Sequence, residues 1–103
     1  MTKVGEHITL DIIGTTKEYD PLLFEKVIHD IAKAAKVTIL NISKYKFEPQ
    51  GFTILALLAE SHISFHTFPE KGIISFDFFT CAKVSPKVAL DILKKEIKHE
   101  RAD

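Results

Sequence analysis

The order in which the hydrophobic repeat changes along the chain limits the fold more than any other feature of this sequence. Apolar and polar residues alternate over His7–Gly14, which is the two-residue repeat of a half-buried strand. Asp20-Pro21 then supplies a helix start, with aspartate as the N-cap and proline at the first helical position. Apolar residues three and four positions apart continue this helix to about Lys36.

Four further strands are expected before a second helix. They span Val37–Ser43, Gly51–Ala59, His62–Phe68 and Ile73–Cys81, and Pro69–Gly72 forms a hairpin connection between the last two. Residues 51–59 are apolar on both faces, as in a central strand. Ser85-Pro86 begins the second helix with the same cap chemistry as the first. The order β-α-β-β-β-β-α predicts an α+β fold, a two-layer sandwich of a mostly antiparallel sheet with two helices on one face.

Length and charge narrow the class of protein. With 103 residues we expect a single domain over 1–103. Lysine plus arginine equals aspartate plus glutamate at 14 each, which argues against a nucleic-acid or anionic-membrane partner, since both require a basic patch. Met1–Gly5 carries no secretory signal, no apolar run could span a bilayer, and one cysteine cannot form an internal disulfide. We therefore expect a cytoplasmic protein.

The polar side of the expected strands carries residues that are unusual for a solvated face. Such a face usually holds Lys, Glu and Thr, whereas this one holds mainly His, Asp, Ser and Cys. The residues on this side are Thr9, Asp11, His62, Ser64, His66, Ser75, Asp77 and Cys81. Their chemistry indicates a lined site on the sheet face that the helices leave uncovered.

Two uncommon sequence runs point to one family. The first is Glu60-Ser-His-Ile-Ser-Phe-His-Thr-Phe-Pro-Glu70, and the second is Asp77-Phe-Phe-Thr-Cys81 at the matching distance downstream. On these runs the chain resembles the S-adenosylmethionine decarboxylases of the short prokaryotic class, a pyruvoyl-dependent family, from about Gly5 to Lys98. Two such runs in the right order and spacing are far more specific than one short motif.

The resemblance implies self-cleavage between Glu60 and Ser61, which gives a β chain of residues 1–60 and an α chain of residues 61–103. Ser61 matches the serine whose hydroxyl attacks the carbonyl of Glu60 and which becomes the pyruvoyl group that forms a Schiff base with the substrate. His66 matches the histidine that takes the serine α-proton during processing. Cys81 matches the cysteine that later donates a proton to the substrate carbon.

The resemblance also implies substrate contacts. Phe47 matches an aromatic residue that stacks on adenine, and Glu70 matches a carboxylate that hydrogen-bonds the ribose hydroxyls. Phe68 stands where tryptophan is frequent. Thr53 stands where the family usually has a serine that steadies the cyclic intermediate. Threonine keeps that hydroxyl but adds a methyl group that restricts χ1, so slower processing is expected.

The chemistry of decarboxylation gives a separate reason for a pyruvoyl group. Loss of carbon dioxide leaves a carbanion that water cannot stabilise, and no amino-acid side chain offers an electron sink. A ketone that condenses with the substrate amine is such a sink, as pyridoxal phosphate is elsewhere. We therefore expect a pyruvoyl made from Ser61 and no pyridoxal phosphate, and a thiol or imidazole can return the proton near neutral pH.

The spacing of Ser61 and His66 raises a geometric problem. They are five residues apart, an odd number, so a regular strand directs their side chains to opposite faces. We therefore expect a bent or bulged backbone at Glu60–His62.

Two other kinds of site are not expected. His62 and His66 would lie about 13 Å apart along one strand, too far for zinc–nitrogen bonds of roughly 2.0–2.1 Å. Nothing in the spacing of His7 or His99 adds a ligand, so no metal is expected. No G-x-S-x-G run supports a Ser-His-Asp hydrolase.

Three functions stay open on the sequence. The first is decarboxylation of S-adenosylmethionine, which supplies aminopropyl groups for spermidine and other polyamines, and Phe47 and Glu70 favour it. The second is the same chemistry on arginine or ornithine. The third is an unprocessed relative that only binds a ligand or a partner chain, and the intact Ser61, His66 and Cys81 argue against it.

The resemblance finally implies a homodimer whose active sites use residues from both subunits, with two α and two β chains after processing. It also implies a further strand after Lys98. We expect no such strand here, because His99–Asp103 is polar and short.

Overall fold

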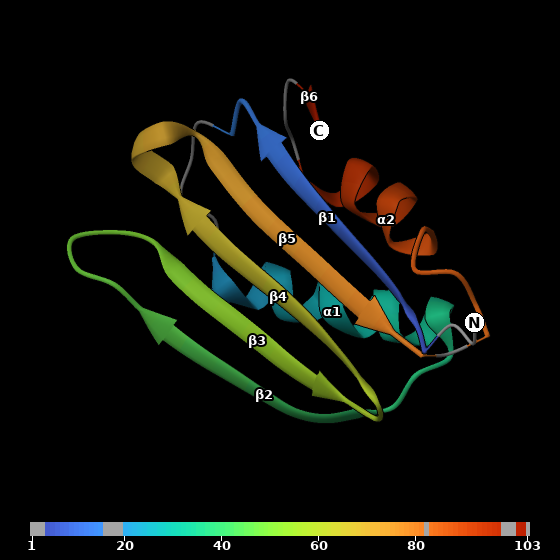
Figure 1. The fold of residues 1–103 in the computed structure, drawn as a ribbon. Coiled ribbons are helices and arrows are strands. Elements are labelled where there is room, and N and C mark those ends of the chain that lie inside the picture. The colour runs from blue at the N-terminus through green and yellow to red at the C-terminus, as the bar shows by residue number, and fades with distance from the viewer. Residues whose placement is uncertain (1–3, 16–19, 82, 98–100, 103) are drawn as a thin grey trace.

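The computed structural model describes residues 4–15, 20–81, 83–97 and 101–102. These residues form one sheet and two helices (Figure 1). The elements are β1 (Glu6–Ile13), α1 (Pro21–Ala35), β2 (Ile39–Lys46), β3 (Phe52–Leu58), β4 (Ser61–Phe68), a short 3₁₀ helix η1 (Pro69–Lys71), β5 (Ile73–Thr80), α2 (Val88–Glu96) and β6 (Arg101–Ala102). The strands lie in the order β2-β3-β4-β5-β1-β6, and every neighbouring pair is antiparallel. The predicted α+β sandwich, with the order β-α-β-β-β-β-α up to α2, is confirmed.

Helix α1 begins and ends where the sequence predicts. The Asp20 carboxylate accepts a hydrogen bond of 2.9 Å from the Leu22 N–H, and Pro21 occupies the first turn, where no N–H partner is needed. Lys36 ends the helix in the left-handed conformation, and its N–H bonds back to carbonyls of the last turn. The apolar stripe of α1 faces the sheet, so the helix covers one face of the sheet (Figure 1).

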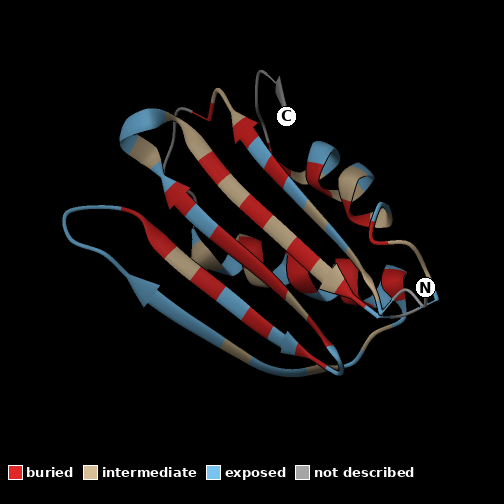
Figure 2. Ribbon diagram, viewed as in Figure 1, coloured by how far each residue is buried: buried red, intermediate tan, exposed pale blue. Residues whose placement is uncertain are grey.

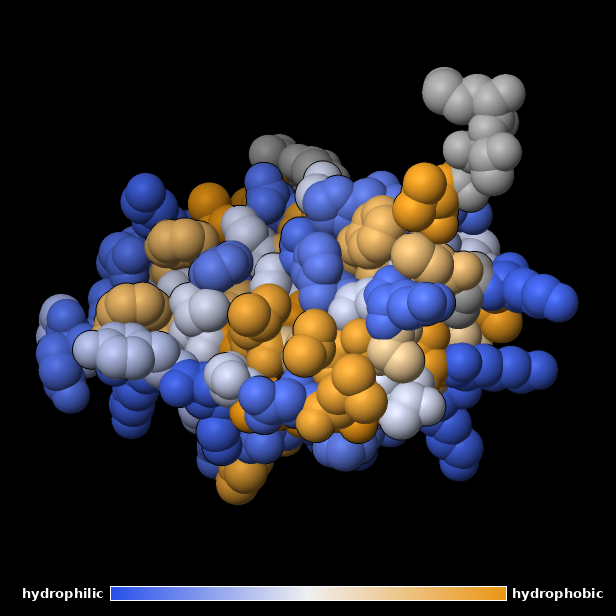
Figure 3. Space-filling model, turned by 60° about the horizontal axis from the view of Figure 1, so that its bottom comes forward, coloured by the Kyte–Doolittle hydropathy of each residue, from blue (hydrophilic) through white to orange (hydrophobic). Residues whose placement is uncertain are grey.

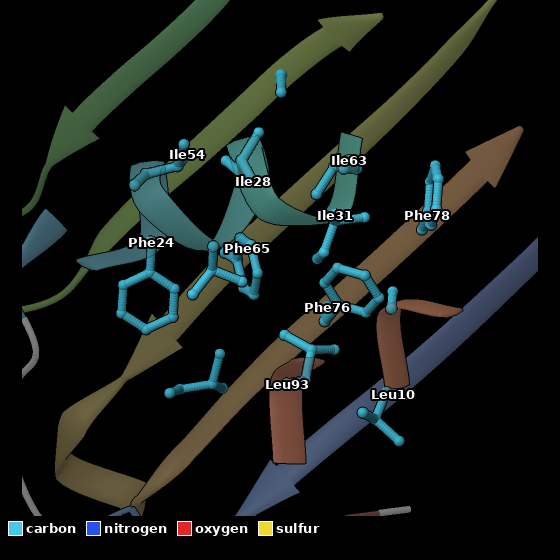
Figure 4. Packing of buried hydrophobic residues seen from close by; sticks show 14 of the residues in the cluster. Leu10, Phe24, Ile28, Ile31, Ile54, Ile63, Phe65, Phe76, Phe78 and Leu93 are labelled. Carbon is cyan, nitrogen blue, oxygen red and sulfur yellow. The ribbon is translucent and has the colours of Figure 1, made fainter. Parts of the chain in front are cut away.

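The core lies between the helices and one face of the sheet. Phe24 of α1 packs edge to face against Phe52 and Phe65, with ring centroids 5.3 and 4.9 Å apart. Figure 4 shows the same arrangement along both helices, with side chains of α1 and Leu93 of α2 directed at apolar side chains of β1, β3, β4 and β5. Figure 2 shows buried and less buried residues alternating along the inner strands. Every second strand residue therefore points away from the core, onto the face that the helices do not cover, here called the open face.

The second helix starts later than expected. Ser85 Oγ accepts a hydrogen bond of 3.2 Å from the Lys87 N–H, and the Ser85 carbonyl accepts one from Val88. These bonds form a turn that precedes the helix, so α2 begins at Val88 instead of Pro86. Ser85 does accept hydrogen bonds from the backbone as predicted, but these bonds close the turn before α2 and do not cap the helix itself.

The prediction that the C-terminal segment forms no strand is wrong. Arg101 and Ala102 form β6, which pairs antiparallel with Ile13 and Ile12 of β1. A ladder uses backbone N–H and C=O groups, so polar side chains do not prevent it, and the free edge of β1 offers such groups. Residues 98–100 and 103 of this segment lie outside the described residues.

The turn between β3 and β4 bends at one residue. The β3–β4 ladder is regular from Leu58 opposite Ser61 to Thr53 opposite His66. Of the bend or bulge predicted at Glu60–His62, the bulge is therefore wrong, because Ser61 and His62 belong to the regular ladder. The chain reverses instead over Ala59 and Glu60, and Glu60 takes a φ of 58°, in the left-handed region. A two-residue turn can reverse the chain without disturbing the register of either strand.

The open face changes character from one side of the sheet to the other. On β3 it carries Leu55 and Leu57, which are 48% and 53% exposed. This strand is apolar on both faces, as the sequence indicates, so its open face also carries apolar side chains. Figure 3, which brings the β2 side of the molecule forward, shows apolar side chains grouped at the surface between polar ones. The strands β4, β5 and β1 carry the polar residues. No helix of the described residues is both long and apolar enough to cross a membrane.

Candidate active site

Ser61 lies at the beginning of β4, where three backbone segments meet. It is only 6% exposed, and its Oγ donates a hydrogen bond of 3.0 Å to Thr80 Oγ1 at the end of β5. The N–H of Cys81 approaches the same oxygen at 3.4 Å. Two of the predicted site residues, Ser61 and Cys81, are therefore neighbours in space, and Thr80 adds a contact that the sequence analysis did not single out.

The peptide bond before Ser61 follows a strained residue. Glu60 adopts a positive φ of 58°, which a residue with a Cβ reaches only at a cost of roughly 1–2 kcal/mol. Turns that need such a φ usually place glycine or asparagine there. A glutamate held in this conformation directly before a buried serine is the kind of outlier that accompanies a functional site.

A second group of predicted residues lies at the opposite end of β3 and β4. They surround a hollow of about 290 Å³ next to the β2–β3 connection and η1. The residues that line it are Phe47, Gln50, Thr53, His66, Thr67, Phe68 and Glu70. Five of these were singled out from the sequence, and the fold brings all five together.

Contacts inside this hollow hold its polar groups in place. Thr53 Oγ1 and His66 Nδ1 lie 2.9 Å apart across the β3–β4 ladder, which fixes one nitrogen of the imidazole ring. Gln50 Nε2 donates a hydrogen bond of 3.2 Å to Glu70 Oε2. Phe47 is 47% exposed and Phe68 37% exposed, so both rings have free surface. Two available aromatic rings, a carboxylate and an imidazole suit a ligand with a planar ring and hydroxyl groups.

One chain does not bring the two groups together. Ser61 and His66 are five positions apart in a regular strand, which is about 17 Å along its length. Their side chains also lie on opposite faces, since Ser61 is on the buried side with Ile63 and Phe65 while His66 is exposed. Cys81 lies with Ser61, at the end of the sheet away from His66. His66 of the same chain therefore cannot act on Ser61 in this conformation.

Between the two groups, the open face carries the polar cluster that the sequence indicates. A second hollow of about 230 Å³ lies over it, lined by Thr9, Asp11, Ser64, His66, Ser75, Phe76 and Asp77. Ser75 Oγ donates to Asp11 Oδ1 at 3.0 Å, and Ser64 Oγ donates to Asp77 Oδ1. His62 lies on the same face with its Nε2 at 3.3 Å from Asp77 Oδ2.

Asp77 has a perturbed pKa for an identifiable reason. Burial opposes ionisation and acts to raise its pKa, but hydrogen bonds from Ser64, His7 and His62 favour the carboxylate and outweigh burial. The pKa of Asp77 therefore lies below its ordinary value.

This shift predicts a pH-dependent contribution to stability. A carboxylate whose pKa is lower in the folded state stabilises the fold above its unfolded pKa and loses that effect as the pH falls through the folded pKa. We expect Asp77→Asn to lower the free energy of unfolding by about 1–2 kcal/mol at pH 7. The difference from the wild type should shrink as the pH drops from about 5 toward 2. Urea titrations at fixed protein concentration measure this.

Asp91→Asn is the matched control, because Asp91 is exposed on α2 and lies off the open face. This variant also removes one negative charge, so it shows how much the free energy of unfolding changes from the loss of charge alone. A difference between the wild type and Asp77→Asn that stays constant over the whole pH range would contradict the role given to the Asp77 hydrogen bonds.

Several residues that line or support these groups were missed, among them Gln50, Thr80 and His7. Gln50 gave no signal, because a single polar residue in a loop is unremarkable. Thr80 was part of a quoted motif, but its contact with Ser61 depends on how β4 and β5 pair. His7 could have been found, since the two-residue repeat of Thr9 and Asp11 places His7 on the same face.

Comparison with known proteins gives one consistent result. The family model described as S-adenosylmethionine decarboxylase matches residues 6–103. The chain is 39% identical over 106 residues to the S-adenosylmethionine decarboxylase proenzyme of Methanococcus maripaludis, covering all of this chain and 87% of that protein. It is 44% identical over 98 residues to the proenzyme of the same name from a Synechococcus species, covering 92% of this chain and 77% of that protein.

A solved structure agrees with these sequence matches. The crystal structure of the adenosylmethionine decarboxylase from Aquifex aeolicus superposes with a TM-score of 0.83 at 30% sequence identity. The match covers 100% of this chain and 88% of that one, so the similarity extends over the whole sheet and both helices.

Proposed function

This chain belongs to the S-adenosylmethionine decarboxylase family, and on that premise we propose that it processes itself and decarboxylates S-adenosylmethionine with a pyruvoyl group made from Ser61. The observation that carries the proposal is the setting of Ser61, which is buried, follows the left-handed Glu60 and has its Oγ held by Thr80 and the Cys81 N–H. The product would be the aminopropyl donor for spermidine and other polyamines.

The processing reaction uses the chain's own groups. Ser61 Oγ attacks the carbonyl carbon of Glu60, and the acyl group moves from nitrogen to oxygen. Loss of the Ser61 α-proton then expels the Glu60 carboxylate by elimination, and water converts residue 61 to a ketone with release of ammonia. Thr80 and the Cys81 N–H hold Oγ at the turn, so its position is set before the attack.

The cut chains would stay together without a covalent link. The first fragment contains β1, α1, β2 and β3, and the second contains β4, β5, α2 and β6. In the sheet, β1 of the first fragment lies between β5 and β6 of the second, and β4 of the second pairs with β3 of the first. Every ladder that crosses the cut is therefore kept, and the two helices bury one common core.

The hollow around His66 supplies the substrate contacts of the proposal. Phe47 offers its exposed ring to the adenine, with Phe68 as a second aromatic wall, and Glu70 accepts hydrogen bonds from the ribose hydroxyls. The ketone made from Ser61 supplies the electron sink for loss of carbon dioxide. Cys81, which is exposed beside Ser61, is the donor that returns a proton to the substrate carbon.

A second copy of the chain is part of the proposal. Because His66 is about 17 Å from Ser61 and on the other face, the His66 group of one copy must serve the Ser61 of another. Thr53 holds that imidazole, which takes the Ser61 α-proton. The half-exposed Leu55 and Leu57 on the open face give the second copy an apolar surface to cover. The active protein is then a homodimer of two α and two β chains.

The proposal is tested by intact-mass spectrometry together with carbon dioxide release. The purified protein should contain fragments 1–60 and 61–103, the second with a blocked N-terminus, and should release labelled carbon dioxide from carboxyl-labelled S-adenosylmethionine. Labelled arginine and ornithine are the matched comparison substrates and should release none. Release from either of these instead would assign the other substrate class, and an uncleaved chain that turns over substrate would overturn the pyruvoyl mechanism.

A further inference from the structure

A second cluster of chemically active side chains lies on the open face, toward the Ser61 end of the sheet. His7 of β1, His62 of β4 and Asp77 of β5 each present one nitrogen or oxygen atom, and the three atoms lie within 4.8 Å of one another. His7 Nε2 is 2.9 Å from Asp77 Oδ2, and His62 Nε2 is 3.3 Å from the same oxygen. Nothing in the proposed decarboxylation uses this cluster.

The surroundings of the cluster orient all three side chains. Ser64 donates a hydrogen bond to Asp77 Oδ1, which leaves Oδ2 directed at the two imidazoles. The ring of Phe79 stacks on His62 with centroids 6.0 Å apart and meets His7 edge to face at 6.1 Å. Neighbouring groups that hold ligand side chains in a fixed orientation are typical of metal sites.

From this arrangement we infer that His7, His62 and Asp77 bind a divalent first-row transition-metal ion, with Zn²⁺ as the representative probe. Two imidazole nitrogens and one carboxylate oxygen match the ligand preference of Zn²⁺, whereas Mg²⁺ and Ca²⁺ prefer oxygen alone. Three protein ligands leave a further coordination position for water or another group. The inference does not depend on the proposed function, because it uses only contacts among these side chains.

The spacing of the ligand atoms agrees with such a site. Metal–ligand bonds of roughly 2.0–2.2 Å in a tetrahedron place neighbouring ligand atoms about 3.4 Å apart. Two of the three separations are 2.9 and 3.3 Å, and the third is within 4.8 Å, so small rotations of the side chains suffice. The ion would take the place of the direct contacts between the imidazoles and Asp77 Oδ2, with the histidines bound through Nε2.

The test is calorimetric titration of untagged, chelator-treated protein with ZnCl₂, with MgCl₂ in parallel. We expect one Zn²⁺ per copy of residues 1–103, whether cut or intact, no uptake of Mg²⁺ and a rise in Tm with Zn²⁺, since a ligand of the folded state stabilises it. His62→Gln and His7→Gln should each weaken Zn²⁺ binding by more than about 100-fold, and Ser64→Ala by about 10-fold. His29→Gln, an exposed histidine on α1, is the matched control and should bind as the wild type does.

Cys81→Ser separates this site from binding at the one cysteine, which is also exposed. It should leave Zn²⁺ affinity unchanged. The inference is overturned if the protein takes up no Zn²⁺, if binding is lost in Cys81→Ser, or if both His7→Gln and His62→Gln bind as tightly as the wild type. In the last two cases the three side chains form only a hydrogen-bonded His–Asp–His cluster.

Discussion

Ser61→Ala should yield one intact chain of residues 1–103 and no measurable release of carbon dioxide. The substitution removes the hydroxyl that is proposed to attack the Glu60 carbonyl, so neither the cleavage nor the ketone should form. Because the ketone is the electron sink, the loss of turnover should be on the order of 10⁴-fold or more, as for removal of an enzymatic nucleophile. Intact-mass spectrometry measures cleavage, and labelled S-adenosylmethionine measures turnover.

Two control variants separate this result from a folding defect. Ser64→Ala removes a hydroxyl from the same strand, three residues further along, and should still give both fragments. Cys81→Ala should also be cleaved, because the backbone N–H that contacts Ser61 Oγ remains, but its turnover should fall by about 10²–10⁴-fold through loss of the proton donor. Cleavage of the Ser61→Ala protein at the same bond would remove Ser61 from the mechanism.

Co-expression of Ser61→Ala and His66→Ala chains should restore activity that neither variant has alone. In a mixed dimer, the Ser61 of the His66→Ala chain meets the intact His66 of the Ser61→Ala chain, so one of the two sites is complete. Random pairing makes half of the dimers mixed, so we expect about one quarter of the wild-type activity. Tags of different mass identify the chain that is cut, which should be the His66→Ala chain only.

The matched control pairs two variants from the same end of the sheet. Ser61→Ala with Cys81→Ala should restore no turnover, because Ser61 and Cys81 lie together in one chain and no mixed dimer unites an intact copy of both. Failure of Ser61→Ala with His66→Ala to restore activity, when mixed dimers are isolated, would contradict a site in which the His66 of one copy acts on the Ser61 of the other. That result would require Ser61 and His66 to act within one chain despite their separation, whereas restoration by Ser61→Ala with Cys81→Ala would contradict a site in which Ser61 and Cys81 come from the same copy.

The failed bulge prediction carries the main lesson about the site. Sequence reasoning correctly placed Ser61 and His66 on opposite faces of a strand, and it then expected a bend or bulge at Glu60–His62 to reconcile their positions, although the family resemblance implied a site shared between subunits. The structure keeps the strand regular and confines the reversal to Ala59 and Glu60, with a positive φ at Glu60. Ser61 and His66 of one chain therefore stay far apart and on opposite faces of β4. In the proposed dimer, the His66 of the second copy reaches Ser61 without any distortion of the strand.

The cluster of His7, His62 and Asp77 shows a different limit of prediction from the sequence. Spacing along one strand correctly separates His62 from His66, but His7 reaches His62 and Asp77 only because β1 lies beside β5, with His7 opposite Phe79. His7 and Asp77 are 70 residues apart in the chain. No local pattern reports such a neighbour, because strand order in a sheet depends on how all of the strands and helices pack.

The sequence by itself determined the elements from β1 to α2, their order and the family motifs, because hydrophobic repeats, caps and contiguous runs are local properties of the chain, but it missed β6. It also singled out Phe47, Glu70 and His66, which line one hollow in the structure, although it said nothing of the distance from that hollow to Ser61. Only the tertiary structure decided which groups meet: Thr80 with Ser61, Thr53 with His66, and His7 with Asp77. These meetings follow from strand register and order, which the packing of both helices on one face of the sheet sets for the whole chain at once.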